Sequence, residues 1–259
     1  MYTGSILVLA LSAASIVSAH GKVTVVQGNL GGNGTALGIK GASVATFGKN
    51  AATELDTTVF GGNANDPTKD GLGKTAADGA VKTTMLKSAV AQSGNTLPQV
   101  SADGTGTITG TWRIVTSDGT ANNAQGDLFA VIDSTGTGAY STGTQLTATS
   151  DMVGNGQGNV VQRSFTKIAR ALGKRATNPF SVKIPAGTTC TGTDATTGMT
   201  NFCLMKIANN NGAGPFGGSI AFQVAGAGAA AGNTTTAAST TTAKAATAKG
   251  NKAAKRFEA

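Results

Sequence analysis

Short stretches that alternate apolar and polar residues, each ended by glycine or a turn dipeptide, limit most strongly how this chain can fold. Phe180, Val182 and Ile184 would share one face of a strand, because successive side chains point to opposite sides of a sheet. A second stretch ends in Asp118-Gly119, a strong hairpin-turn dipeptide. Three further strands are predicted within residues 126–140, 200–209 and 217–226. Many short strands between glycine-rich turns predict a mainly β fold, an antiparallel β-sandwich.

Two segments depart from the strand pattern. Residues 78–94 carry apolar side chains near helical spacing, and the predicted helix ends at Gly94. Residues 163–175 place apolar side chains on one helical face and basic side chains on the other, which fits a helix packed on the sheet edge, a basic excursion or a membrane-surface helix. This segment ends in Lys174-Arg175, a dibasic candidate for proteolytic processing.

The glycine-rich sequences "GGNG" at 31–34 and "GNGQG" at 154–158 are similar to phosphate-binding loops. They lack the strand-to-helix setting and the Lys-Ser/Thr ending of such loops, so both are interpreted as turns.

The first nineteen residues predict the compartment. An uncharged apolar run from Ile6 to Val17, followed by small residues, is typical of a signal peptide and is shorter than a membrane span. We therefore expect a secreted, extracellular protein without a membrane span. The two cysteines, Cys190 and Cys203, fit one disulfide in an oxidising compartment.

The domain organisation follows from composition. Residues 1–19 are the predicted signal peptide, residues 20–225 are long enough for one domain, and residues 226–259 form an Ala/Thr/Lys-rich tail that we expect to be disordered. Five basic residues and one glutamate follow residue 225, which gives the tail +4 of the formal net charge of +8. The rest of the chain is only mildly basic, so no nucleic-acid partner is expected. Asn33 and Asn233 lie in N-glycosylation sequons.

Several stretches together resemble the Egh16-like virulence factor family of fungi, whose members are also described as Gas or Mas appressorium proteins. They are "SAHG" at the signal boundary, "TLPQVSADG", "PAGTTCTG" with "NFCLMKIAN", and "GPFGG". The resemblance runs from about Ala19 to Val224. It implies a secreted virulence protein of the penetration organ, and it implies no particular biochemical activity.

His20 is the single histidine and would be the first residue of the mature chain. Its amino nitrogen and ring nitrogen suit Cu(II). The chain thus begins like the copper monooxygenases that attack polysaccharides, whose mature chains also start with histidine on a β-sandwich. The expected sandwich is accordingly immunoglobulin-like or copper-monooxygenase-like, with one or two short helices. Those enzymes add a second histidine that this chain lacks, so a carboxylate would have to complete the site; the candidates are Asp118, Asp127, Asp133 and Asp151.

Other catalytic chemistry has little support in the sequence. A Ser-His-Asp or Cys-His mechanism would need His20 as its base, at a chain end where it is poorly held. Glycoside hydrolysis needs two facing carboxylates, and Glu54 is the single glutamate before the tail. Sugar binding on an aromatic platform could use Trp112, Tyr140 or some of the nine phenylalanines, although a tryptophan within a strand is typical of a core.

Three hypotheses remain. The first is a secreted, non-catalytic protein of the appressorium that acts at the host surface or on cell-wall polysaccharide. The alternatives are a copper-binding, polysaccharide-monooxygenase-like protein that uses His20, and a polysaccharide-binding module.

Overall fold

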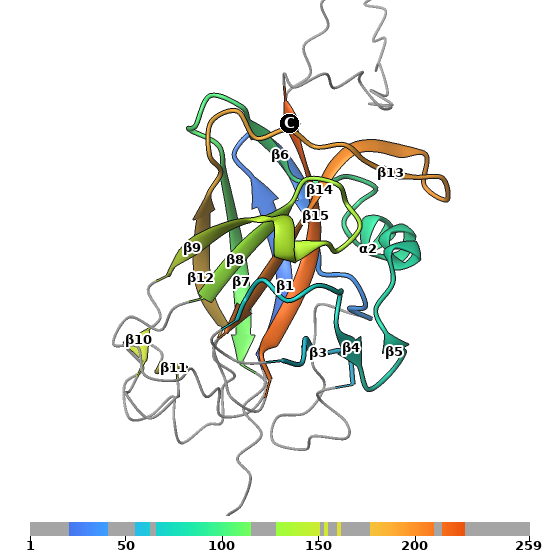
Figure 1. The fold of residues 1–259 in the computed structure, drawn as a ribbon, viewed down its shortest axis with the longest axis vertical. Helices are drawn as coiled ribbons and strands as arrows, with labels where there is room; N and C mark the ends of the chain where they lie inside the picture. Colours follow the sequence, from blue (N-terminus) through green and yellow to red (C-terminus); the bar gives the residue numbers. More distant parts are fainter. Residues whose placement is uncertain are drawn as a thin grey trace, which may run out of the picture.

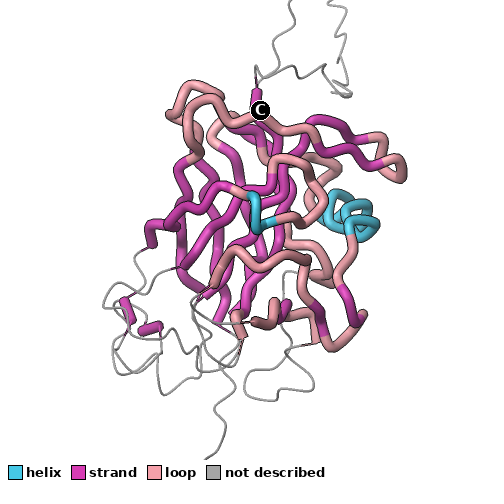
Figure 2. Tube along the Cα trace, in the orientation of Figure 1, coloured by secondary structure: helices cyan, strands magenta, loops and turns pink. Residues whose placement is uncertain are grey.

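The computed structural model describes residues 21–40, 55–62, 66–114, 128–150, 153–154, 160–161, 177–209 and 214–225. Strands make up most of these residues, and helix is limited to small segments (Figures 1 and 2). The strands are β1 (Gly21–Gly28), β2 (Gly31–Gly34), β3 (Thr58–Val59), β4 (Lys74–Thr75), β5 (Gly79–Ala80), β6 (Gln99–Ser101), β7 (Thr107–Ile114), β8 (Leu128–Asp133), β9 (Thr144–Ser150), β10 (Val153–Gly154), β11 (Val160–Val161), β12 (Thr177–Lys183), β13 (Gly192–Asp194), β14 (Met199–Asn209) and β15 (Phe216–Ala225). The helical segments are η1 (Thr83–Met85), α2 (Leu86–Gln92) and η2 (Tyr140–Thr142).

The strands form two layers that are joined along one side. One layer has the order β2-β1-β7-β12, and the other continues β9-β8-β14-β15-β3-β4-β5. Strand β9 joins them, because it pairs with β8 along its length and with β12 at Phe180↔Ser150. These pairs are antiparallel, whereas β6 runs parallel to β15. The prediction of a mainly β, antiparallel sandwich is confirmed.

The space between the layers holds the main core. Strands β1, β7 and β12 contribute one wall, and β8, β14 and β15 contribute the other. Phe180, Val182 and Ile184 point inward and are at most 3% exposed, whereas Lys183 is exposed, as the alternation predicts. Trp112 is fully buried in this core, which confirms its interpretation as a core residue.

A second apolar cluster covers the outer face of the β8-β14-β15 layer. It consists of Leu37, Leu72, Val81, Leu86, Ala89, Val90, Leu97, Val131, Tyr140, Phe202, Leu204 and Ala221. Helix α2 supplies three of these side chains, and Gly94 follows the helix with φ 74°, a conformation that glycine adopts without a steric cost. The predicted helix within residues 78–94 is therefore confirmed. The second predicted helix, at 163–175, lies outside the described residues.

One local prediction is wrong. Residues Gly31–Gly34 are not a turn; they form β2, with Gln27↔Asn33 and Val26↔Gly34 as partners on β1. Close packing explains the glycine at position 32 of this strand. A Cβ at Gly32 would lie 2.0 Å from the Leu97 carbonyl oxygen. Three glycines also remove the side-chain alternation from which a strand is predicted.

Aspartate side chains organise several turns. In the sequences Asp66-Pro67-Thr68, Asp103-Gly104-Thr105 and Asp133-Ser134-Thr135, one carboxylate oxygen accepts hydrogen bonds from both the backbone N–H and the hydroxyl of the threonine two residues on. Such turns fix the local path of the chain by hydrogen bonds between residues close in sequence, without contacts to distant apolar side chains.

Candidate functional site

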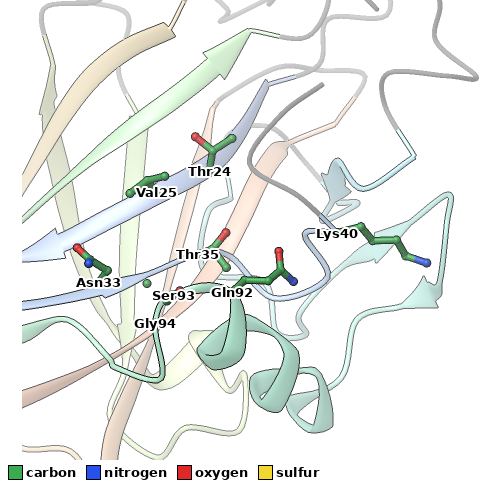
Figure 3. Close-up of a pocket in the computed structure, with 9 residues that line it drawn as sticks. Thr24, Val25, Asn33, Thr35, Lys40, Gln92, Ser93 and Gly94 are labelled. Atoms are coloured by element: carbon green, nitrogen blue, oxygen red, sulfur yellow. The ribbon is translucent and has the colours of Figure 1, made fainter. Parts of the chain in front are cut away.

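A groove of about 640 Å³ lies where the β1–β2 hairpin meets the end of α2 (Figure 3). Its walls are Thr24, Val25, Asn33, Gly34, Thr35, Lys40, Gln92, Ser93 and Gly94. This volume is within the range of sites that bind small ligands. The groove therefore joins two segments that are more than fifty residues apart in the sequence.

A bulge in β1 shapes one wall of the groove. Val23 pairs with Trp112 and Val25 with Thr111, so Thr24 is an extra residue between them. The bulge leaves Val25 45% exposed along the groove, while Thr24 stays buried. Bulges commonly redirect side chains next to functional sites.

The opposite wall is held by side-chain hydrogen bonds. The Nε2 amide of Gln92 donates to the Ile39 carbonyl oxygen at 2.8 Å and to the Ser88 hydroxyl at 3.1 Å. Both hydrogens of this amide are thus used, and the carbonyl oxygen of Gln92 is left to accept. Ser93 donates its hydroxyl to the Ala89 carbonyl oxygen at 2.8 Å.

Thr35 differs from the other polar residues of the groove. It is only 8% exposed, and its hydroxyl has no hydrogen-bond partner among the described residues. Its oxygen points toward the space between β1 and α2 in Figure 3. A buried polar group without a partner costs about 1–3 kcal/mol. Thr57 and Thr58 carry similarly unpaired buried hydroxyls, but neither lines the groove.

The charge of the groove is nearly balanced. Lys40, at its rim, forms an ion pair with Asp78 at 2.8 Å. Below it, the buried Lys22 ammonium contacts the Asp56 carboxylate at 2.5 Å, and that carboxylate also accepts the Lys40 backbone N–H at 3.2 Å. This buried pair joins the start of β1 to the segment before β3.

A second buried lysine, Lys206, lies under the loop that precedes β4. Its ammonium donates to the carbonyl oxygens of Pro67 and Lys69, and lies 4.4 Å from the centre of the Tyr140 ring. Desolvation lowers the pKa of Lys206 to about 8, although the nearby charge of Asp66 acts in the opposite direction. The lysine therefore holds the loop through hydrogen bonds to backbone carbonyl oxygens, although burial disfavours its charged form.

Tyr140 completes this anchor. It is fully buried, and its hydroxyl donates to the Ser219 hydroxyl at 2.8 Å. Burial raises the pKa of Tyr140 well above its ordinary value. With Tyr140 and Trp112 both in the interior, the predicted aromatic sugar platform cannot be built from either residue.

Asp133 is not suited to the metal role considered from the sequence. Desolvation would raise its pKa, but hydrogen bonds from Thr135, Gly138 and Thr137 outweigh that effect and hold the pKa below 3.8. Its second carboxylate oxygen alone accepts the N–H groups of Thr137 at 2.8 Å and Gly138 at 2.7 Å. Asp133 is also at the end of β8 remote from Gly21, because it is Leu128, at the other end of β8, that lies at the end of the sandwich where β1 begins.

The strand register places several strand ends at the same end of the sandwich as the start of β1. Gly21 pairs with Ile114 on β7, and the next strands along the layers bring Ser150 of β9 and Leu128 of β8 to the same end of the sandwich. Asp127 directly precedes Leu128 and Asp151 directly follows Ser150 in the sequence. A Cβ on Gly21 would lie 2.2 Å from the Trp112 ring, so this glycine lets the start of β1 pack on the core.

The remaining predicted site residues divide into two groups. Cys190 and Cys203 form the expected disulfide, with their Cα atoms 4.8 Å apart, and Asn33 is exposed on β2. The other predicted site residues lie outside the described part of the chain; they are His20, Asp118, Asp127, Asp151, Lys174, Arg175 and Asn233.

Among the described residues, no cluster of three or more His, Cys, Asp or Glu side chains could hold a metal ion. Within the same ranges, no helix has the length and apolar character needed to cross a membrane.

Sequence patterns did not reveal the groove or the Lys206 anchor. The groove is made of threonine, serine and amide side chains from separate segments, which match no motif. Lys206 stands within the apolar run "NFCLMKIAN", and a charged residue in such a run was the one available signal.

Comparisons with known proteins give a consistent result. The family model described as "Egh16-like virulence factor" matches residues 18–217. The appressoria-specific virulence factor GAS1 of Pyricularia oryzae is 29% identical over 223 residues, which cover 86% of this chain and 78% of that protein. No solved structure matches.

Proposed function

The chain belongs to the Egh16-like virulence factor family, and we propose that it is a secreted protein that acts at the cell-wall or host surface without catalysing a reaction. A virulence-associated role follows from the family. The compartment, the site of action and the absence of catalysis are the proposed parts.

The way the structure uses its perturbed ionisable groups carries the non-catalytic part of the proposal. Shifted pKa values often cluster at functional sites, and structural networks shift them too. Among the described residues, three such groups hold the fold: Asp133 closes a turn, Lys206 holds a loop, and Tyr140 donates to Ser219 inside the molecule.

The disulfide and the sequence at the chain start support secretion. Disulfides persist in oxidising compartments, and the apolar run before residue 20 has the features of a signal peptide.

Expression of the full chain in a filamentous fungus tests this proposal. The culture fluid, the washed cell wall and the cell extract are probed separately, and the recovered protein is analysed by intact mass and N-terminal sequencing. We expect a chain that starts at His20 in the fluid and on the wall. Retention of the full-length chain inside the cells would refute the proposal.

Copper binding at His20 is a second candidate, favoured by the strand register. Leu128 and Ser150 lie at the end of the sandwich where β1 begins, and Asp127 and Asp151 are their neighbours in the sequence. An amino nitrogen, a ring nitrogen and a carboxylate oxygen suit Cu(II), and the bound ion would supply redox chemistry there. Cu(II) titration followed by electron paramagnetic resonance tests this, with His20→Ala as the variant that should lose a stoichiometric nitrogen-rich signal.

A further inference from the structure

The groove between β1, β2 and α2 offers hydrogen-bonding groups that the fold itself does not use. We propose that this groove binds a neutral saccharide, with the Thr35 hydroxyl as a direct contact. The inference rests on the proposed action at a wall or host surface, because it names the class of molecule that the protein would meet there.

The lining determines the charge of the ligand. Threonine, serine, asparagine and glutamine supply most of the polar groups, and among the described lining residues no side chain is a carboxylate. The single cation, Lys40, is paired with Asp78. A charged ligand would therefore find no unpaired opposite charge, whereas a neutral ligand rich in hydroxyl groups would find both donors and acceptors.

Two groups favour hydroxyl-bearing ligands in particular. The Thr35 hydroxyl is more than nine-tenths buried and unpaired within the described part of the chain, so a ligand that reaches it supplies a missing hydrogen bond. The Gln92 carbonyl oxygen can accept, since its amide hydrogens are donated to Ile39 and Ser88. In Figure 3 Thr35 and Gln92 both point into the space between β1 and α2. The exposed methyl groups of Val25 add an apolar surface for a sugar ring.

A peptide strand fits this groove less well than a saccharide. A peptide would add to the free edge of β2, but that edge is already covered by the segment before β6. The Asn33 backbone N–H donates to the Thr96 hydroxyl at 3.0 Å, and its carbonyl oxygen accepts from the same hydroxyl at 3.3 Å. A strand-like partner would lack the main-chain hydrogen bonds on which such recognition depends.

The saccharide could come from two sources. One is a wall polysaccharide; the other is a glycan attached to Asn33, which lines the groove and begins the sequon Asn33-Gly34-Thr35. Both present the same neutral sugar chemistry, so production with and without N-glycosylation separates them.

The test compares three substitutions in the full chain. Thr35→Val removes the hydroxyl with little change in shape, and it leaves no protein group unpaired, so the fold is retained. Thr35→Ser keeps both the hydroxyl and the sequon. Thr58→Val is the matched control, because it removes a buried, unpaired hydroxyl outside the groove.

Isotope-labelled protein from a bacterial periplasm, which carries no N-glycan, is titrated with cello-, laminari-, chito- and manno-oligosaccharides and followed by amide NMR. We expect one or more of these sugars to shift the signals of Gly34, Thr35, Gln92 and Gly94. Thr35→Val should weaken binding about ten-fold, the effect of one lost hydrogen bond, while Thr35→Ser and Thr58→Val bind within about three-fold of the wild type.

The same titration is repeated with wild-type protein from a fungal host, whose N-glycosylation is checked by intact mass. Binding by the unglycosylated protein from the bacterial periplasm, but not by the glycosylated wild type, would also support the proposal and identify the attached glycan as the occupant. No binding in any arm, or equal binding by Thr35→Val and wild type, would refute it. If saccharide binding fails but the secreted wild type is still recovered on the washed cell wall, only the saccharide-binding role of the groove is refuted. The proposed role at the surface then stands.

Discussion

The two outer faces of the sandwich differ in how far they are exposed to solvent. Much of the outer face of the β2-β1-β7-β12 layer is open to solvent, with Gln27, Thr109 and Lys183 exposed along it, whereas Lys22 near the start of β1 is buried. The outer face of the β8-β14-β15 layer is covered by α2, η2 and their loops, which bury a second apolar cluster that includes Phe202 and Tyr140. The molecule therefore buries apolar side chains on three of the four faces of its two layers.

The groove lies where these two kinds of surface meet. Thr24 and Val25 belong to the open layer, while Gln92 and Ser93 belong to the cover. An open polar face alone would offer no concavity, and a covered face alone would expose no strand. The boundary between them is where hydroxyl groups of a sheet and amide groups of a helix can face the same ligand.

The largest predicted difference between the two faces is in packing. Phe202→Ala, in the cover cluster at 1% exposure, should lower the free energy of unfolding by about 3–5 kcal/mol because it leaves a cavity. Val25→Ala, on the open face, should change it by less than about 0.5 kcal/mol. Chemical denaturation of both variants measures the contrast. Similar losses in the two variants would show that the cover contributes little.

Cys203, the residue after Phe202, allows the inner core to be tested separately from the cover. Cys203 is fully buried in the inner cluster, and Phe202 lies in the cover, because adjacent residues of β14 face opposite sides. The double variant Cys190→Ala, Cys203→Ala should lower the free energy of unfolding by about 3 kcal/mol, since it removes the constraint on the unfolded chain. Reduction of the wild type should give a matching loss in the same denaturation assay, and a variant as stable as the oxidised wild type would contradict the prediction.

Much of the inner core could be predicted from the sequence. The alternation through Phe180, Val182 and Ile184 and the position of Trp112 are confirmed, because each depends on a local pattern that the sheet preserves. The family indicated by the sequence motifs is confirmed as well. Of the four candidate carboxylate ligands, Asp133 lies within the described residues, and its carboxylate is occupied by hydrogen-bond donors that follow it within six residues.

The covered face and the groove could not be predicted in the same way. Lys206 is buried because carbonyl groups of Pro67 and Lys69, nearly 140 positions earlier in the chain, approach it in the folded state. Strand β2 escaped prediction because its glycines carry no side-chain pattern. Features that depend on contacts between distant segments leave no periodic signal in the sequence.

Replacing Asp133 tests how much the charge of its carboxylate contributes to the stability of the covered face. Asp133→Asn should lower the free energy of unfolding at neutral pH by about 2 kcal/mol, because several N–H donors lose a charged acceptor. The native pKa lies below 3.8, so the wild type loses this stability as the pH falls below that value, when the unfolded chain takes up the proton first. Denaturation at a series of acid pH values should show a flatter profile for the variant. Asp103→Asn, in an exposed turn of the same kind, should lose less stability, and an equal loss would contradict the assigned role.

Lys206 gives the smallest and most specific contrast between the faces. Its native pKa of about 8 lies below the ordinary 10.5, so the unfolded chain binds the proton more strongly and the free energy of unfolding rises with pH between these values. Allowing for solvent screening, the gain between pH 7 and pH 9 is about 1 kcal/mol. Lys206→Met should abolish this rise, while Lys183→Met, on the open face, should retain it. Denaturation at the two pH values measures the difference, and a rise that persists in Lys206→Met would mean that another group titrates as the fold forms.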